Sequence, residues 1–165
     1  MSQNLLSEIF SLSKEVVAAG LTSGSTVATA ESCTGGLIGA AITATPGSST
    51  VFHGGIIAYH NSVKTSQLSV EQSALDEYGA VSKVVAKQMA QGCRKRLNVD
   101  IAVSVTGVAG PGGGSIEKPV GTVWIGLAYG DKVSAALHNF PNLTRNKVRD
   151  YTCLAALKTL LIAMK

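Results

Sequence analysis

A serine stands in a turn of small residues, where its hydroxyl could act as a nucleophile. Ser32 lies in the segment Ala-Glu-Ser-Cys-Thr-Gly-Gly (30–36), between an apolar run that predicts a buried strand (25–30) and a second apolar run, Leu37 to Ala44, that predicts a helix (33–44). Backbone N–H groups at the start of a helix lack partners within the helix and favour negative charge. They could stabilise the oxyanion that forms when a hydroxyl attacks a carbonyl. The alternative interpretation is that Ser32 and Thr34 only cap the helix.

A lysine downstream of this serine could serve as its base. Lys64 falls in the first turn of a short helix that we expect to begin at Asn61, as its cap, and to end at about Leu68. The helix dipole disfavours a cation at that end, and burial lowers the pKa of an amine. A neutral amine could take the proton of Ser32, with Tyr59 bonded to either side chain as a proton relay. The alternative is a solvated surface lysine.

Cys33 is a second candidate nucleophile. A thiol at a helix N-terminus has a lowered pKa, and His53, His60 or His138 could serve as its partner. No Cys/His sequence signature accompanies it, however, and a small buried cysteine is common. We therefore rank Ser32 above Cys33.

A glycine-rich segment (107–115) follows a predicted strand (100–106), which is where open α/β sheets bind ligands. It matches neither the GxGxxG fingerprint nor a P-loop, but its backbone amides could form an anion-binding nest. The alternative is a structural turn. The three histidines lack the spacing of metal ligands, so we expect no metal site.

The bulk composition narrows the class of protein. A chain of 165 residues fits a single domain (1–165), and 45% hydrophobic with 15% charged residues is unlike a disordered chain. The net charge of +4 favours anionic ligands, but the basic residues form no stripe for nucleic acid. Three widely spaced cysteines indicate neither a disulfide framework nor a zinc site. Without a signal-peptide or membrane-helix pattern, the chain is expected to be soluble and cytoplasmic.

Helical and strand patterns alternate along the rest of the chain. The patterns predict helices over 3–20 (ending at Gly20), 71–78, 83–97 (capped by Ser82) and 144–164, a turn at 46–49, strands over 51–59 and 100–106, and a hairpin of 120–129 with 132–139. This alternation predicts an α/β sandwich with a mostly parallel sheet and one antiparallel strand.

Taken together, these segments resemble the CinA C-terminal domain family. The resemblance runs in order from about residue 5 to residue 160. It rests on the segment 30–36, Pro46-Gly47-Ser48-Ser49, Gly54-Gly55 leading to Tyr59-x-Asn61-x-x-Lys64, Gly79-Ala80-Val81-Ser82, Thr106-Gly107-x-Ala109-Gly110-Pro111 and Lys118-Pro119-Val120-Gly121-Thr122-Val123.

The resemblance implies an α/β fold, a three-layer α/β/α sandwich with a mixed, mostly parallel sheet. It also implies an amidase that hydrolyses the carboxamide of nicotinamide mononucleotide to nicotinate mononucleotide and ammonia, in pyridine-nucleotide salvage, by a Ser/Lys-type mechanism without a cofactor. The catalytic residues it implies are Ser32, Tyr59 and Lys64. The residues expected to bind the substrate are Glu31, Thr34, Gly35, Gly36, Thr106, Gly107, Gly110, Arg145 and Arg149.

Two departures from the family pattern leave other functions open. His53 stands where many members have arginine, and Leu143-Thr144-Arg145 stands where many have Gly-Asp-Arg. The alternatives are a catalytically silent nucleotide-binding or stress-associated paralogue and a serine or cysteine amidase for another amide. The expected partners are a small nucleotide and further copies of the chain, with a dimer as the first candidate, but no nucleic acid or membrane. Larger family proteins carry an extra N-terminal domain, and the resemblance implies nothing about the activity of that domain.

Overall fold

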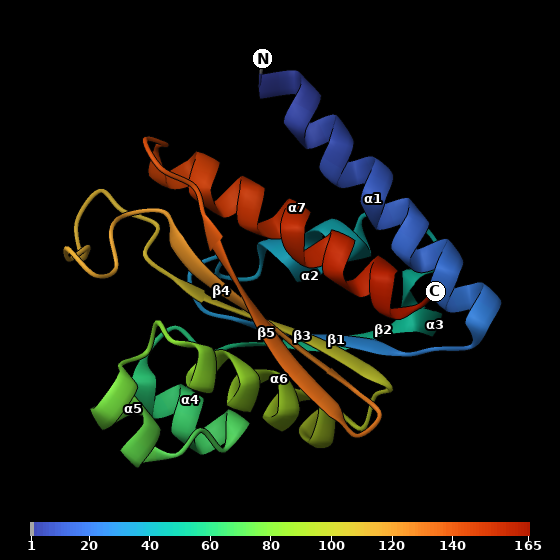
Figure 1. Cartoon of the computed structure of the whole chain (residues 1–165). Helices are drawn as coiled ribbons and strands as arrows, with labels where there is room; N and C mark the ends of the chain where they lie inside the picture. The colour runs from blue at the N-terminus through green and yellow to red at the C-terminus, as the bar shows by residue number, and fades with distance from the viewer. Residues whose placement is uncertain (1) are drawn as a thin grey trace.

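The structure is a computed structural model that describes residues 2–165, with side chains from residue 4 onward. Helices and strands alternate along the chain, as Figure 1 shows. The elements are α1 (Ser2–Ser23), β1 (Val27–Glu31), α2 (Leu37–Thr43), α3 (Ser48–Val51), β2 (Phe52–Ile57), α4 (Asn61–Leu68), α5 (Gln72–Tyr78), α6 (Lys83–Leu97), β3 (Ile101–Gly107), β4 (Thr122–Tyr129), β5 (Lys132–Asn139) and α7 (Arg145–Ala163).

The strands form one mixed sheet in the order β2-β1-β3-β4-β5. Strand β1 pairs in parallel with β2 and with β3, whereas the β3–β4 and β4–β5 pairs are antiparallel. Four strands therefore run in one direction and only β4 runs against them. This confirms the predicted α/β fold with a mostly parallel sheet.

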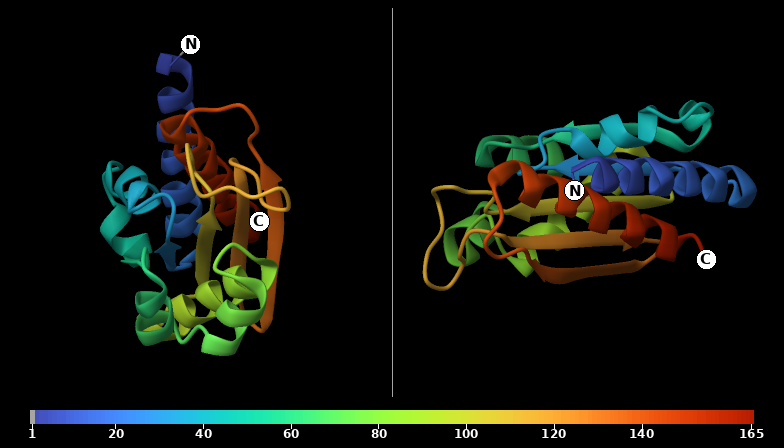
Figure 2. Two further views of the ribbon diagram at one scale, coloured as in Figure 1. Left: turned by 90° about the vertical axis from the view of Figure 1, so that its left-hand side faces the viewer. Right: turned by 90° about the horizontal axis from the view of Figure 1, so that it is seen from above.

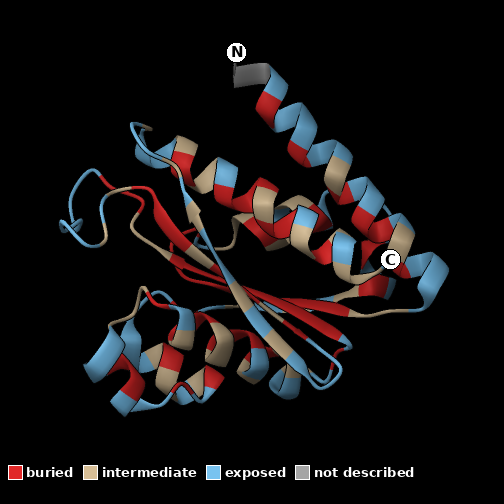
Figure 3. Ribbon diagram, in the orientation of Figure 1, coloured by how far each residue is buried: buried red, intermediate tan, exposed pale blue. Residues whose placement is uncertain are grey.

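Helices cover both faces of the sheet and make the molecule a three-layer sandwich. Helices α1, α2 and α7 lie on one face and α4, α5 and α6 on the other, and α1 and α7 run side by side (Figures 1 and 2). Each face has its own apolar cluster, as expected for a central strand buried on both sides. Along β3, Ile101 and Val103 pack toward α1 and α7, and Ala102 packs toward α6. Buried residues accordingly concentrate between the layers (Figure 3).

The carboxyl ends of β1 and β3 bring two loops together. Because these strands are parallel neighbours, the turn after Glu31 lies beside the glycine-rich loop after Gly107. The amide of Ser32 donates to the carbonyl of Val105, 3.1 Å away, and so ties the turn to β3. The two segments that the sequence singled out thus meet at one edge of the sheet.

Several element boundaries differ from the predicted ones. Helix α1 continues past Gly20 to Ser23, because Gly20 lies against the side chain of Val51 and supplies space for packing rather than a helix end. The short helix α3 begins at Ser48, inside the predicted turn at 46–49. Helix α4 has His60 as its N-cap, which accepts a hydrogen bond from the amide of Ser62, and not Asn61.

Candidate functional site

A buried lysine contacts the hydroxyl of Ser32. Nζ of Lys64 lies 3.1 Å from Oγ of Ser32, and only 1% of the residue Lys64 is exposed. Strand β2 and the start of α4 carry the lysine back toward the turn that follows β1, because β2 pairs in parallel with β1. Ser32 and Lys64 are thus in contact, as the predicted serine–lysine pair requires, and Lys64 is not a solvated surface residue.

The surroundings of Lys64 suit a neutral amine. Nζ donates to the carbonyl oxygens of Ala58 at 2.8 Å and Tyr59 at 3.2 Å, besides its contact with Ser32. A neutral amine has two N–H groups, which match the two carbonyls, and one lone pair, which can accept the proton of the Ser32 hydroxyl. Burial lowers the pKa of Lys64 below its ordinary value of 10.5, against a smaller raising effect of the Cys33 thiol. The amine is therefore disposed to act as a general base.

Cys33 does not share this activation. Its side chain is buried, and burial raises the pKa of the thiol to about 12, so the thiol stays protonated at neutral pH. The cysteine also precedes the first residue of α2, Leu37, by four positions, because α2 begins later than the predicted helix over 33–44. The lowered pKa expected of a cysteine at a helix start is therefore absent, and Ser32 remains the better nucleophile.

The amides at the start of α2 are already bonded. The carboxylate of Glu31 accepts hydrogen bonds from the backbone of Gly36, Ile38 and Gly39. These amides were the ones expected to stabilise an oxyanion, and they are not free to do so. Cys33 and Thr34, between Ser32 and the glycines, have amides with no hydrogen bond to another described residue.

The hydroxyl of Tyr59 points to an arginine. It accepts a hydrogen bond of 2.8 Å from Nη2 of Arg145, and 59% of the tyrosine is exposed. Nη1 of Arg145 donates to the carbonyl of Gly110 at 2.7 Å, so this arginine links Tyr59 to the glycine-rich loop. The Tyr59 hydroxyl therefore does not form the expected bond to Lys64 or Ser32. The backbone carbonyl of Tyr59 accepts a hydrogen bond from Lys64 instead.

A pocket of about 240 Å³ opens in front of Ser32. Six residues with predicted roles line it: Ser32, Cys33, Tyr59, Gly107, Gly110 and Arg145. No individual site role was predicted for the other lining residues Val108, Ala109, Gly112 and Gly113, although all four belong to the segment considered as an anion nest (107–115). Lys64 stands behind Ser32 and does not line the pocket.

Other residues expected to bind substrate lie outside the pocket wall. The hydroxyl of Thr106 donates to the carbonyl of Ala80, and Nη2 of Arg149 donates to the carbonyl of Thr34 at 2.8 Å. Gly35 and Gly36 have φ angles of 62° and 99°, which a side chain disfavours, and they allow the chain to turn into α2. Glu31, Thr34, Gly35, Gly36 and Arg149 therefore shape the turn, Thr106 bonds the segment before α6, and only Arg145 of the two arginines lines the pocket.

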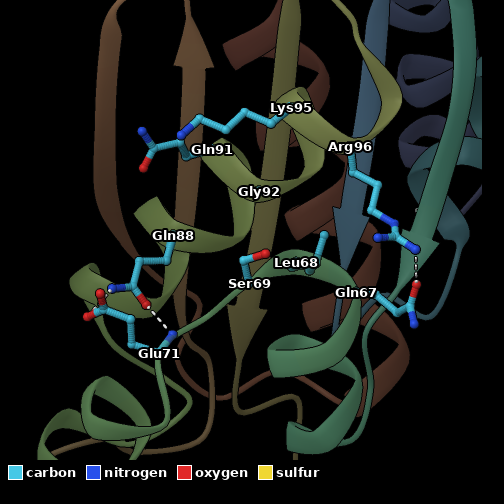
Figure 4. Close-up of a pocket in the computed structure, with 9 residues that line it drawn as sticks. All are labelled: Gln67, Leu68, Ser69, Glu71, Gln88, Gln91, Gly92, Lys95 and Arg96. Atoms are coloured by element: carbon cyan, nitrogen blue, oxygen red, sulfur yellow. Dashed lines mark hydrogen bonds between the residues drawn. The ribbon is translucent and has the colours of Figure 1, made fainter.

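A larger pocket, of about 410 Å³, lies between α4 and α6 (Figure 4). Its walls are mostly polar and carry Gln67, Glu71, Gln88, Lys95 and Arg96. Side chains there bond to one another: Arg96 donates to Gln67 and Gln88 to Glu71. No nucleophile in this pocket is bonded to a base among the described residues, so the pocket at Ser32 is the better candidate site.

Residues 2–165 hold neither a cluster of metal ligands nor a membrane-spanning helix. No three or more His, Cys, Asp or Glu side chains in this range gather as metal ligands would. Within the same range, none of the helices combines the length and the apolar character needed to cross a membrane.

Known proteins resemble this chain along most of its length. The sequence profile of the CinA C-terminal domain matches residues 9–164. A CinA-like protein of Trichodesmium erythraeum is 51% identical over 142 residues, which are 85% of this chain and 33% of that protein, and one of Parasynechococcus marenigrum is 47% identical over 151 residues, 91% of this chain and 36% of that protein. The chain thus spans about a third of these relatives.

Solved structures share the fold. The competence/damage inducible protein CihA of Agrobacterium tumefaciens is 39% identical, with a TM-score of 0.93 and 96% of each chain covered. A CinA superfamily protein of Escherichia coli is 30% identical, with a TM-score of 0.89 over 95% of this chain and 90% of that chain.

Proposed function

Because the chain belongs to the CinA C-terminal domain family, and because a buried amine touches its pocket serine, we propose that it is a nicotinamide-nucleotide amidase. It hydrolyses the carboxamide of nicotinamide mononucleotide to nicotinate mononucleotide and ammonia, as a step of pyridine-nucleotide salvage in the cytoplasm. The whole chain acts as one amidase domain. The observation that carries the proposal is the contact of 3.1 Å between Lys64 Nζ and Ser32 Oγ in a lysine that is almost fully buried.

The first half of the reaction forms an ester on Ser32. The neutral amine of Lys64 takes the hydroxyl proton as Oγ attacks the carbon of the carboxamide, and the carbonyl oxygen gains the negative charge. When the tetrahedral intermediate collapses, the C–N bond breaks and the proton held by Lys64 passes to the leaving nitrogen. Ammonia departs, and the nicotinoyl group remains bound to Oγ.

The second half releases the product. Lys64, neutral again, takes a proton from a water molecule, and the hydroxide attacks the ester carbon. The bond to Oγ breaks, Oγ regains the proton from Lys64, and nicotinate mononucleotide leaves. The proton acceptor is an amine and the nucleophile a hydroxyl, so the mechanism uses no metal or cofactor.

Arg145 is the group proposed to attract the phosphate of the nucleotide. It is a cation on the pocket wall, and its guanidinium already donates to Tyr59 and to the glycine-rich loop. Guanidinium groups bind phosphate through two parallel hydrogen bonds. Gly107 and Gly110 are proposed to contact the substrate as well. The other residues are proposed to act from behind the wall: Glu31, Thr34, Gly35, Gly36 and Arg149 by holding the turn, and Thr106 by its bond to Ala80.

Release of ammonia from three related compounds tests the proposal. We expect a much higher kcat/KM for nicotinamide mononucleotide than for its riboside or for free nicotinamide, because binding energy at the phosphate helps to place the amide. Activity should persist with a chelator present. Equal values for all three compounds would contradict a phosphate site. Binding of the mononucleotide without ammonia release would favour the silent nucleotide-binding paralogue instead.

A further inference from the structure

A carboxylate lies buried immediately before the nucleophile. Glu31 ends β1, and only 1% of the residue is exposed. Its Oε2 accepts hydrogen bonds from the hydroxyl of Thr34 at 2.6 Å and from the amides of Gly36 at 3.0 Å and Ile38 at 3.1 Å. Its Oε1 accepts a bond from the amide of Gly39 at 2.9 Å. Four donors thus converge on one side chain.

Hydrogen-bond donors, rather than a cation, balance this charge. Among the residues whose side chains are described, the one ion pair within 4.0 Å joins Lys158 to Glu8 on the surface, and none involves Glu31. A buried carboxylate is unfavourable unless its oxygens are bonded, and here both oxygens are. The four bonds all come from residues 34–39, so the carboxylate gathers the whole segment that follows Ser32.

The backbone of Ser32 is held from other directions too. Its amide donates to Val105 on β3, and its carbonyl accepts the amide of Gly35 at 3.1 Å. With Glu31 fixing the far side of the turn, the position of Oγ relative to Lys64 is set by bonds on both sides. A reacting group must be held to within about 0.5 Å for full activity.

We propose that Glu31 is a positioning residue for the amidase reaction: its carboxylate binds the amides that begin α2 and the Thr34 hydroxyl, and so holds Ser32 Oγ against Lys64. This inference rests on the proposed function. It gives the buried charge a role distinct from binding the substrate. The oxyanion is then stabilised by amides that Glu31 does not bind, namely those of Cys33 and of the glycine-rich loop.

The reactivity of Ser32 toward a fluorophosphonate tests the positioning without using the nucleotide. In this reaction Oγ forms a bond to phosphorus, fluoride leaves, and the hydroxyl proton passes to Lys64. The Glu31→Gln variant keeps the size of the side chain and removes its charge, and its NH2 group can no longer accept from Gly39. We expect it to label at Ser32 about 100-fold more slowly than the wild type, since a displacement near 1 Å has effects of that size. Its kcat with the nucleotide should fall in parallel, with KM little changed.

Asp100→Asn is the matched control. Asp100 also accepts hydrogen bonds from a backbone amide and a hydroxyl, both of Thr26, at 2.8 Å each, but at the opposite edge of the sheet. The Asp100→Asn variant also loses one negative charge, and its labelling rate should equal that of the wild type. Intact mass of the labelled protein, and circular dichroism of each variant, report modification and folding separately.

Each remaining outcome either supports or contradicts the positioning role of Glu31. Should Glu31→Gln fail to fold, Glu31→Asp and Thr34→Val take its place: the aspartate, which keeps the charge, should label faster than Thr34→Val or at least as fast, and both more slowly than the wild type. Wild-type labelling rates in folded Glu31→Gln, or in both replacement variants, would overturn this inference alone. A wild type that does not label at Ser32 would overturn the serine–lysine pair, and with it both proposals.

Discussion

Among the residues whose side chains the structure describes, Lys64 has hydrogen-bond acceptors around it and no paired carboxylate that would favour its charged form. Its Nζ meets two carbonyl oxygens and the Ser32 hydroxyl, and no acidic side chain pairs with it among the described residues. Each pKa unit by which burial lowers an amine corresponds to about 1.4 kcal/mol of preference for the neutral form. The same burial that makes Lys64 a base therefore opposes folding while the unfolded chain holds the proton.

Substitution of Lys64 by arginine should abolish activity. The Lys64→Arg variant keeps a cation but cannot give up its proton at a usable pH, so its ammonia release should be nearly as low as that of Lys64→Ala. Lys83→Arg, on the exposed side of α6, is the matched control and should behave as wild type. In the wild type, kcat/KM should fall as the pH drops through the lowered pKa of Lys64. A Lys64→Arg variant with normal turnover and the same pH profile would mean that Lys64 is only a fixed charge.

The stability of a Lys64→Met variant, compared with that of the wild type, should increase as the pH falls. As the pH falls below 10.5, the unfolded wild-type chain takes up a proton at this lysine before the folded chain does, because burial lowers the folded pKa. Wild-type stability should therefore decrease over that window, and the variant has no such loss. Urea unfolding at about pH 10 and about pH 8 measures this. The free energy of unfolding of Lys64→Met relative to wild type should rise toward the lower pH, and a constant difference would contradict the lowered pKa.

At the scale of elements, the sequence predicted best where local signals and tertiary packing agree. The bounds of α6 were predicted correctly, because Ser82 caps its start with a bond to the amide of Val85 and basic residues close its last turn. The hairpin of β4 and β5 was also predicted. The predictions failed where a distant contact decides: the end of α1 depends on Val51.

The start of α2 was predicted four residues too early for a similar reason. The predicted helix included the small residues 33–36 ahead of the apolar run at 37–44, but these residues form a turn whose following amides bond the side chain of Glu31. That interaction joins residues up to eight positions apart and has no signature in periodicity.

In the site, the serine–lysine pair could be predicted, whereas the other hydrogen-bond partners could not. A serine in a turn and a lysine at a helix start suggested a pair, and the fold brings them into contact across 32 positions. The carbonyls of Ala58 and Tyr59 complete the lysine's surroundings, but every residue has a carbonyl, so sequence cannot single them out. The bond from Arg145 to the Tyr59 hydroxyl spans 86 positions and depends on where α7 begins.

Close contact between two helices gives a prediction at this scale. A Cβ atom at Gly92 of α6 would overlap the backbone carbonyl of Leu68 at the end of α4. Gly92→Ala should gain about 1 kcal/mol of helix propensity, but forcing the helices apart costs about 1–3 kcal/mol or more when a backbone must move. We expect a net loss in the free energy of unfolding by urea. Gln91→Ala, at the exposed neighbouring position, is the control and should be neutral or stabilising. A more stable Gly92→Ala protein would contradict the tight packing of α4 on α6.

For the whole molecule, the arrangement of the sheet places the chemistry at one edge. Parallel strands β1 and β3 end beside each other, β2 returns the chain to the same place, and α7 brings Arg145 over the resulting pocket. A net charge of +4 suits an anionic ligand there. The expected homo-oligomer stays a prediction, which sedimentation of the purified chain can test.

The rate of ammonia release from nicotinamide mononucleotide by Ser32→Ala, measured beside Cys33→Ala, tests the identity of the nucleophile most directly. Loss of a covalent nucleophile lowers kcat by several orders of magnitude, so Ser32→Ala should be almost inactive. Cys33→Ala should keep most of the wild-type turnover, because the buried thiol is protonated and contributes packing only. Wild-type turnover in Ser32→Ala, with activity lost in Cys33→Ala, would contradict the account.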